Sequence, residues 1–285
     1  AISATLSGPA HSGRLFSLPI VCRFRRVCGI RRLLFLEYRE GLCPKQGATH
    51  RKDMDHTMNE LEIKDQICDV CHKMWQLGWV AANDGNVSVK LGDGTYFATP
   101  TGISKSFITP EKIVRIDDKG EVLEGKEGYR PSSEIKMHLR CYQERADVGA
   151  VVHAHPPTAT GFAVAHLDMD RYNMIETVLT LGSVHVPPYD TPSTYEVPEA
   201  IAPYLQEHDA LLLMNHGALT VGCDLITAYY RMETLELNAK ISLVAHLLGG
   251  EREISHENID RLCSMREGYG ITGKHPGFKH YREEK

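Results

Sequence analysis

The stretch Val-Val-His-Ala-His-Pro-Pro, residues 151–157, places two histidines at the end of a short apolar run. The run is predicted to form a buried strand, and alternate residues of a strand share one face. The imidazoles of His153 and His155 are therefore expected to point the same way. A third histidine, His216, follows another apolar run in Met-Asn-His-Gly (214–217). Three neutral imidazoles from two strand ends are typical of a catalytic zinc site with one open position.

A glutamate precedes the histidine strand. Glu134 lies in Pro-Ser-Ser-Glu (131–134), at the beginning of a helix predicted over residues 132–144. A carboxylate held beside a metal ion can act as an acid or a base near neutral pH. A glutamate in a first helical turn also interacts favourably with the helix dipole, without any role in catalysis. The spacing alone leaves both interpretations open.

The rest of the chain alternates between predicted strands and helices, without a linker, repeat or low-complexity stretch. Helical apolar spacing and capping residues predict the helices, and short apolar or alternating runs predict the strands. The predicted helices cover residues 59–78, 132–144, 157–165, 194–206, 225–248 and 257–268, and the predicted strands cover residues 87–91, 95–98, 113–116, 121–123, 149–152, 183–186, 210–214 and 218–221. This interleaving indicates one α/β domain.

Composition narrows the class of protein. The chain has 285 residues, of which 42% are apolar and 24% charged, as in ordinary globular proteins. Residues 1–53 carry ten basic and three acidic side chains, which leaves 22 basic and 34 acidic ones in the remainder. An acidic body argues against nucleic acid as a partner, and no apolar run is long enough to predict a membrane-spanning helix. The eight cysteines lack the spacing of a disulfide scaffold, so we expect reduced thiols in a cytoplasmic protein.

The basic beginning of the chain differs from the rest. Its Arg-rich, acid-poor composition fits an organellar transit peptide, and a basic tail could also bind a polyanion. The favoured interpretation is a start assigned too early, with the protein beginning at Met54 or Met58, because the first helical pattern follows Met58 directly. We therefore expect a non-native or disordered leader at 1–57, a zinc domain at 58–272 and a polar tail at 273–285.

A family resemblance follows from the order of the motifs. Each motif alone is a weak signal, but together they resemble the class II aldolase/adducin family, and within it the L-fuculose-phosphate aldolases. The resemblance covers about residues 58–269. The motifs are Asp-Gly-Asn-Val-Ser (84–88), Thr-Pro-Thr-Gly (99–102), Pro-Ser-Ser-Glu (131–134), Val-Val-His-Ala-His (151–155) and Asn-His-Gly (215–217).

The resemblance implies a single-domain α/β/α sandwich around a central, mainly antiparallel β-sheet. It implies one Zn²⁺ per subunit, held by His153, His155 and His216. Glu134 would ligate the ion or lie beside it at rest, and act as acid and base during turnover. Tyr269, in Glu-Gly-Tyr-Gly (267–270), matches a tyrosine that protonates the aldehyde oxygen. The family's members are usually homotetramers with sites at subunit interfaces.

The resemblance also implies a sugar phosphate as substrate. Glycines that let the backbone approach an anion, hydroxyl donors and a helix start suit phosphate binding. The implied reaction is reversible cleavage of a ketose 1-phosphate, such as L-fuculose 1-phosphate, to dihydroxyacetone phosphate and an aldehyde. Zinc would act as a Lewis acid that stabilises the enediolate formed when Glu134 removes a proton. The implied phosphate-binding residues are Gly85, Asn86, Thr101, Gly102, Ser132 and Ser133.

Other activities remain open at this point. A dehydratase of methylthioribulose 1-phosphate would use the same metal ligands and phosphate loops. A pentulose-5-phosphate 4-epimerase is disfavoured, because that group has aspartate where Glu134 stands. A non-catalytic binding module like the adducin head domain is the least favoured, because the histidines and the glutamate are intact. The aldehyde preference is open too, since either Tyr172 or Glu176 matches a further active-site tyrosine only loosely.

Overall fold

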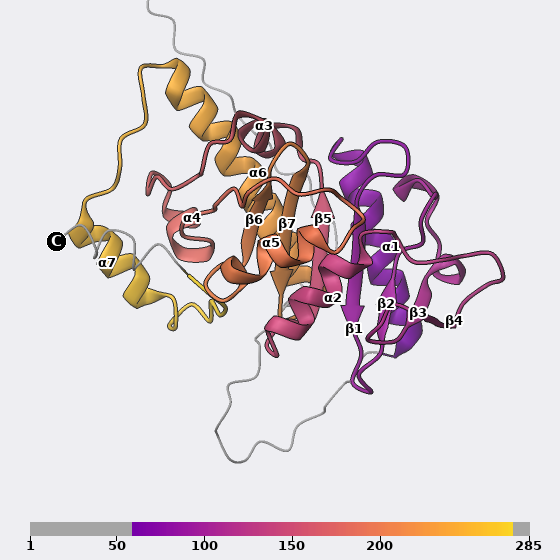
Figure 1. The fold of residues 1–285 in the computed structure, drawn as a ribbon. Coiled ribbons are helices and arrows are strands. Elements are labelled where there is room, and N and C mark those ends of the chain that lie inside the picture. The colour runs from indigo at the N-terminus through magenta and orange to yellow at the C-terminus, as the bar shows by residue number, and fades with distance from the viewer. Residues whose placement is uncertain (1–58, 276–285) are drawn as a thin grey trace, which may run out of the picture. The chain divides into compact units, whose positions relative to one another are not determined.

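The structure, a computed structural model, describes residues 59–275, so the predicted leader and most of the predicted tail lie outside the described residues. These residues form one seven-stranded sheet in the order β4-β3-β2-β1-β5-β7-β6, and its neighbouring strands are antiparallel (Figure 1). The strands are β1 (Asn86–Lys90), β2 (Tyr96–Ala98), β3 (Val114–Ile116), β4 (Val122–Glu124), β5 (Ala150–Ala154), β6 (Ala210–Leu213) and β7 (Gly217–Gly222). The helices are α1 (Glu60–Gln76), α2 (Ile135–Glu144), α3 (Pro157–Ala165), α4 (Ile175–Thr180), α5 (Glu196–Leu205), α6 (Leu225–Leu247) and α7 (His256–Met265), with short 3-10 turns η1 (Lys105–Phe107) and η2 (Pro110–Lys112).

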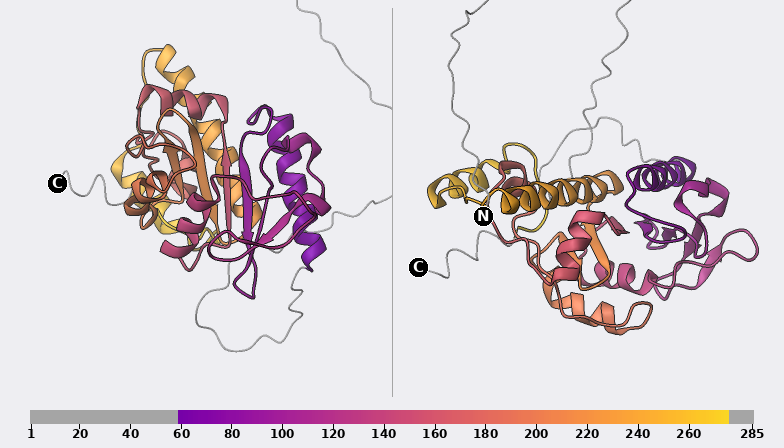
Figure 2. Two further views of the ribbon diagram at one scale, coloured as in Figure 1. Left: turned by 45° about the vertical axis from the view of Figure 1, so that its right-hand side comes forward. Right: turned by 90° about the horizontal axis from the view of Figure 1, so that it is seen from above.

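The interior strand β5, which lies between β1 and β7, separates two apolar cores. Val152 packs in a core with residues of α1, α3 and α6, whereas Val151 packs in a second core with residues of α2 and α5. Figure 2 shows α1 and α6 on one side of the sheet and α5 on the other. Because β5 is buried on both faces, its sequence is apolar apart from His153 and does not alternate with polar residues. The predicted α/β/α sandwich with a mainly antiparallel sheet is confirmed.

The first helix forms where its capping residues predict it. The side chain of Asn59 accepts a hydrogen bond from the Glu62 N–H, and the Glu62 carboxylate accepts one from the Asn59 N–H. This reciprocal pair satisfies two of the N–H groups that a helix start leaves without partners. The buried face of α1 includes Ile67, Val70 and Met74, which pack toward the sheet. Within residues 59–275, no helix combines the length and the apolar character that a bilayer crossing requires.

Two local predictions differ from the structure. Residues 183–186 were predicted to form a strand, but they make only isolated bridges, Val184 with Met169 and His185 with Leu211. Pro187 and Pro188 follow directly, and proline has no N–H with which to continue a ladder. The short helix α4 was not predicted, because a helix of six residues is too brief to give a periodic apolar pattern.

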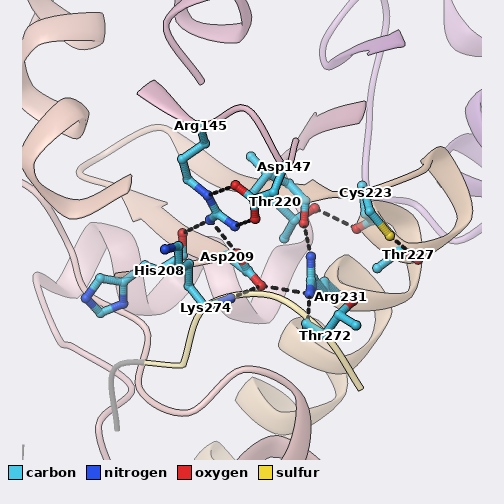
Figure 3. A network of polar contacts seen from close by, with 12 residues as sticks. Arg145, Asp147, His208, Asp209, Thr220, Cys223, Thr227, Arg231, Thr272 and Lys274 are labelled. Carbon is cyan, nitrogen blue, oxygen red and sulfur yellow. Dashed lines mark hydrogen bonds and ion pairs between the residues drawn. The ribbon is translucent and has the colours of Figure 1, made fainter. Parts of the chain in front are cut away.

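The end of the described chain is tied to the sheet by a buried polar network (Figure 3). The fully buried carboxylate of Asp209 forms ion pairs with Arg145 and Arg231 at 2.5 and 2.7 Å. It also accepts a hydrogen bond from the Lys274 N–H at 2.8 Å, and Arg231 donates to the carbonyl oxygen of Thr272. Residues 272–274 are therefore anchored to β6 and α6.

Candidate active site

His153 lies on an interior strand of the sheet. It belongs to β5, pairs with Asn86 of β1 and Leu219 of β7, and is fully buried. Its Nδ1 lies 2.9 Å from the carbonyl oxygen of Ala218. A carbonyl oxygen only accepts hydrogen bonds, so Nδ1 carries the proton and the lone pair is on Nε2. The hydrogen bond from Nδ1 to Ala218 therefore orients the imidazole and leaves Nε2 available as a ligand atom.

His155 follows the last residue of β5. Its N–H donates to the carbonyl oxygen of Trp79 at 2.8 Å, and Pro156 and Pro157 come next in the chain. Its Nε2 lies 3.2 Å from Nε2 of His153. The expectation that the two imidazoles point the same way agrees with this distance.

His216 comes from a tight hairpin between β6 and β7. Leu213 pairs with Gly217, and the His216 N–H donates to the Leu213 carbonyl oxygen at 2.9 Å. Asn215 takes the left-handed conformation that such a turn requires, with φ of 56°. The absence of a side chain at Gly217 makes room for the histidines, because an ideal Cβ there would lie 2.5 Å from Cδ2 of His155. The hairpin thus places the third imidazole beside the other two.

Glu134 closes the cluster on its remaining side. It immediately precedes α2, at the N-cap position. Its Oε1 lies 3.2 Å from Nε2 of His216, and its Oε2 lies 3.4 Å from Nε2 of His153. The side-chain amide of Asn86 donates to Oε2 at 2.8 Å and fixes the carboxylate in place. The residues predicted to hold the metal are thus adjacent in space, although the chain separates them widely.

The spacing of the ligand atoms fits a tetrahedral metal ion. The side chains of His153, His155 and His216 each offer a ligand atom, all within 4.8 Å of one another. Zinc–nitrogen bonds of about 2.0–2.1 Å in a tetrahedron separate neighbouring ligand atoms by about 3.3 Å. The pairs His153–His155, His216–Glu134 and His153–Glu134 have separations of 3.2, 3.2 and 3.4 Å, close to that value. The histidines together with Glu134 therefore have the geometry and the chemistry to hold such an ion.

The charge state of the histidines also suits a metal. Burial, together with the neighbouring imidazoles, holds the pKa of His153 well below its usual range. Burial and the imidazole of His216 likewise lower the pKa of His155. Both imidazoles are therefore neutral near pH 7, which is the form that binds metal.

The segment Gly85–Asn86, which was predicted to bind phosphate, lies beside the cluster of three histidines and Glu134. Gly85 has φ of 71°, and an ideal Cβ on it would lie 2.6 Å from Cγ1 of Val80 and 2.9 Å from the carbonyl oxygen of His153. Only glycine fits this position. The next residue, Asn86, is buried and donates to Ser132 Oγ at 3.2 Å as well as to Glu134. Both amide donors of Asn86 are thus used within the protein, so it joins this segment to the start of α2.

The other predicted phosphate residues lie on two loops that run side by side. Pro100 forms an isolated bridge with Pro131, the Thr101 N–H donates to the Arg130 carbonyl oxygen, and the Ser132 N–H donates to that of Thr99. The side chains of the paired loops reach toward solvent. Thr101, Gly102 and Ser133 are exposed, and Ser132 is half-buried.

Tyr269 is not part of this cluster within one chain. It lies beyond the end of α7, and its side chain is 61% exposed. In Figure 1, α7 lies beyond α4, at the opposite side of the molecule from α1 and β1. Of the loosely matched residues, Tyr172 is buried in a small cluster with Val178 and Ile259, and Glu176 is exposed on α4.

The sequence did not single out Glu236, which supports the turn after His155. Its buried carboxylate accepts the N–H groups of Thr158 and Ala159 at 3.1 and 2.8 Å, and the Thr158 hydroxyl at 2.9 Å. It therefore caps α3, which begins two residues after His155. Its burial could have been predicted from the sequence, because Glu236 is a charged residue on the apolar face of α6, one turn after Met232. Nothing in the sequence indicates that Lys105, at the start of η1, is buried, since lysine is usually exposed.

Comparison with known proteins decides the family. The model of the Class II Aldolase and Adducin N-terminal domain matches residues 65–243, which is more than half of the chain. The chain belongs to this family. An L-fuculose phosphate aldolase of Escherichia coli is 34% identical over 215 residues, which cover 75% of this chain and 98% of that relative.

Two further relatives extend the comparison. A 3-oxo-tetronate 4-phosphate decarboxylase of Escherichia coli is 28% identical over 74% of this chain and 99% of its own length. A solved structure of an L-fuculose 1-phosphate aldolase has a TM-score of 0.67 at 29% identity, and the match covers 72% of this chain and 96% of that one. Aldolases and decarboxylases are both lyases, and the prediction that this chain is a lyase enzyme is confirmed.

Proposed function

We propose that the protein is a zinc-dependent aldolase that reversibly cleaves a ketose 1-phosphate, such as L-fuculose 1-phosphate, to dihydroxyacetone phosphate and an aldehyde. The observation that carries the proposal is the Glu134 carboxylate, which contacts two of the three clustered histidines. An acid/base group at a metal site is what carbon–carbon cleavage beside a ketone requires. The fuculose phosphate aldolases among the relatives support this choice of substrate.

His153, His155 and His216 are the proposed ligands of one zinc ion per subunit, with Glu134 as a fourth ligand at rest. When bound, the ion would supply Lewis-acid polarisation of the substrate's ketone oxygen. Glu134 is the proposed base that takes the proton from the hydroxyl-bearing carbon in the synthetic direction and returns it after cleavage. Asn86 holds this carboxylate in position through its 2.8 Å hydrogen bond.

The phosphate is proposed to bind where the paired loops meet the Gly85–Asn86 segment. Thr101, Gly102 and Ser133 are exposed there, so their hydroxyl and backbone groups are accessible to an anion. Gly85 lets the backbone pass close to the metal ligands, and Ser132 offers its hydroxyl from the start of α2. These are the six phosphate-binding positions that the sequence predicted, with Asn86 acting mainly as the link between the loops and Glu134.

Tyr269 is assigned the proton donor to the aldehyde oxygen. Because it is exposed and lies apart from the histidines of its own chain, we assign this role across a subunit boundary, in a homotetramer with sites at its interfaces. The tetramer remains a prediction from the family resemblance, and the cytoplasmic location remains a prediction from the spacing of the cysteines.

A 3-oxo-tetronate 4-phosphate decarboxylase is the second candidate, favoured by the relative that covers 74% of this chain. Its chemistry is close to that of the aldolase. Loss of CO₂ from the carboxylate beside the hydroxyl-bearing carbon leaves the same three-carbon fragment, which becomes dihydroxyacetone phosphate once protonated. Both reactions therefore need one acid/base group next to a polarised ketone. They differ in the group that leaves, an aldehyde or CO₂, and only release of the aldehyde needs proton transfer at the aldehyde oxygen, the role proposed for Tyr269.

The test is a comparison of substrates on the metal-loaded protein. Purified protein would be analysed for zinc and then incubated separately with L-fuculose 1-phosphate, 3-oxo-tetronate 4-phosphate and methylthioribulose 1-phosphate. Dihydroxyacetone phosphate with an aldehyde indicates the aldolase, dihydroxyacetone phosphate with CO₂ the decarboxylase, and water loss without cleavage the dehydratase. Glu134→Gln is expected to retain zinc and lose turnover, and a fully active variant would show that the base is assigned wrongly.

A further inference from the structure

Lys105 is a buried lysine next to the proposed phosphate site. It begins η1, and only 1% of its surface is exposed. Its Nζ donates to the carbonyl oxygens of Asn83 and Ile103 at 3.3 and 3.2 Å. Among residues 59–275, no carboxylate forms an ion pair with it. An ammonium group is thus held inside the protein by two neutral oxygen atoms.

The two acceptors belong to the two segments that carry proposed phosphate residues. Asn83 lies two residues before Gly85, and Ile103 directly follows Gly102. One side chain therefore bonds to the backbone of both segments and sets the distance between them. It does so from the inside of the protein, and the paired loops face outward.

The ammonium also lies within electrostatic reach of the metal cluster. Burial lowers the pKa of Lys105, and the carboxylates of Asp84 and Glu134 oppose that shift. In the other direction, the positive charge of Lys105 contributes to the lowered pKa of His153. Because the charge already acts on these neighbouring groups, and because the ammonium lies inside the protein rather than in water, an anion bound over the two segments would also interact with it.

We propose that Lys105 is a positioning residue for the substrate's phosphate, which holds the two loops at a fixed spacing and supplies the charge that a phosphate dianion needs behind them. The inference rests on the proposed function, because it needs a phosphate at these loops. It adds a specificity determinant, since such a charge favours a dianionic group over a neutral one of the same size.

The energetics of burial argue against a purely structural role. Burying an ammonium group without an ionic partner is unfavourable, and replacing buried charges by apolar groups of similar size is often neutral or stabilising. Methionine could occupy the space of the lysine stem and lose only the charge and its two hydrogen bonds. The fold alone therefore has little need of the ammonium, whereas an anion site does.

The test compares Lys105→Met with Lys112→Met in the zinc-loaded protein. Lys112 is a matched control, because its Nζ also donates to a backbone carbonyl oxygen, that of Phe107, but in an exposed position. Inorganic phosphate affinity would be measured by calorimetry, and KM and kcat with the phosphorylated substrate. We expect Lys105→Met to weaken phosphate binding about tenfold, or about 1.4 kcal/mol. In Lys105→Met, KM would rise by a larger factor than kcat falls, while the zinc content would be unchanged and the melting temperature no lower. Lys112→Met would match the wild type in all of these measurements.

Lys105→Gln separates spacing from charge, because the amide can still donate a hydrogen bond but carries no charge. Lys105→Gln is expected to weaken phosphate binding too. It also keeps the charge testable if Lys105→Met fails to fold. Unchanged phosphate affinity in both variants, with normal binding by the wild type, would overturn the role of Lys105 and leave the proposed function intact. If neither variant folds, Lys105 serves the fold and the inference is wrong. If the wild type binds no inorganic phosphate, the proposed phosphate site fails as well.

Discussion

Replacing Gly217 by alanine would add one methyl group at a crowded point of the cluster formed by His153, His155, His216 and Glu134. Its ideal Cβ would lie 2.5 Å from Cδ2 of His155, 2.6 Å from the carbonyl oxygen of Ala154 and 3.3 Å from Cε1 of His153. Ordinary carbon–carbon contacts begin near 3.5 Å, so the first of these distances is about 1 Å too short. The carbonyl belongs to β5, which is paired on both sides, so the His155 ring is the group most free to move.

Two separate effects follow from this clash. An extra methyl group in a packed interior costs about 1–3 kcal/mol of folding stability. Displacing His155 also spoils the ligand geometry, and misplaced support of a metal ligand typically lowers metal affinity about 10–100-fold. We therefore expect Gly217→Ala to lose about 1–3 kcal/mol in the metal-free state and at least about 1.4 kcal/mol of zinc binding.

The assay measures both effects on the same preparation. Urea unfolding of the metal-free protein gives the stability change, and competition with a chromophoric chelator gives zinc affinity. Gly161→Ala is the control, because that glycine lies within α3 and its ideal Cβ has no neighbour within 4 Å apart from the adjoining residues and the backbone of its own helix. Alanine there should stabilise the protein by about 0.5–1 kcal/mol and leave zinc binding unchanged. Wild-type zinc affinity in Gly217→Ala would refute the argument that this glycine makes room for the ligands.

Three further expectations concern stability and metal binding. Asp209→Asn should lower the free energy of unfolding by about 3–5 kcal/mol, because it leaves the buried Arg145 and Arg231 without their shared negative charge. Asp147→Asn removes only a half-exposed partner of Arg145 and should lower the free energy of unfolding by at most about 1 kcal/mol. Equal losses in the two variants would contradict this expectation. Glu236→Gln should weaken zinc binding about tenfold in chelator competition, because it disturbs the cap of α3 beside the metal ligands, and wild-type affinity would count against that role. Burial lowers the pKa of His138 to about 3 and of His208 to about 4, so the unfolded chain binds more protons than the folded one below about pH 6.5. From these two histidines alone, the stability of the metal-free protein should fall as the pH drops from 6.5 to 4, by about 2.7 kcal/mol per pH unit at the steepest point. The lowered pKa values of His153 and His155 act in the same direction, and a flat urea-unfolding profile in this range would exclude the effect.

Much of the site could be predicted because its residues stand at the ends of regular elements. His153 and His216 follow apolar runs that are buried on both faces, and such runs can be recognised without knowing which strands pair. Glu134 stands at a helix start marked by two serines. The sheet order, in contrast, depends on long-range pairing that no local pattern reports. The antiparallel arrangement was expected from the family resemblance alone.

The residues that were missed act through contacts between distant segments. Lys105 carries no local sign of burial, because the groups that surround it come from α1 and from a loop some twenty residues earlier. The strand predicted at 183–186 failed for a related reason. Val184 is buried and Val186 is partly buried, but prolines follow and the neighbouring strand offers the segment only an isolated bridge. Burial and strand pairing are separate properties, and the pattern reports only the first.

The position of β5 between β1 and β7 has a consequence for the order of folding. Asn86 pairs with His153, and His153 pairs with Leu219, so both ladders that flank the strand close long loops of chain. Such non-local pairings form slowly, after local helices and hairpins. The imidazoles and Glu134 can therefore meet only when the centre of the sheet is complete. A metal ion bound by these residues would act late, by retarding unfolding of the finished domain rather than by nucleating it.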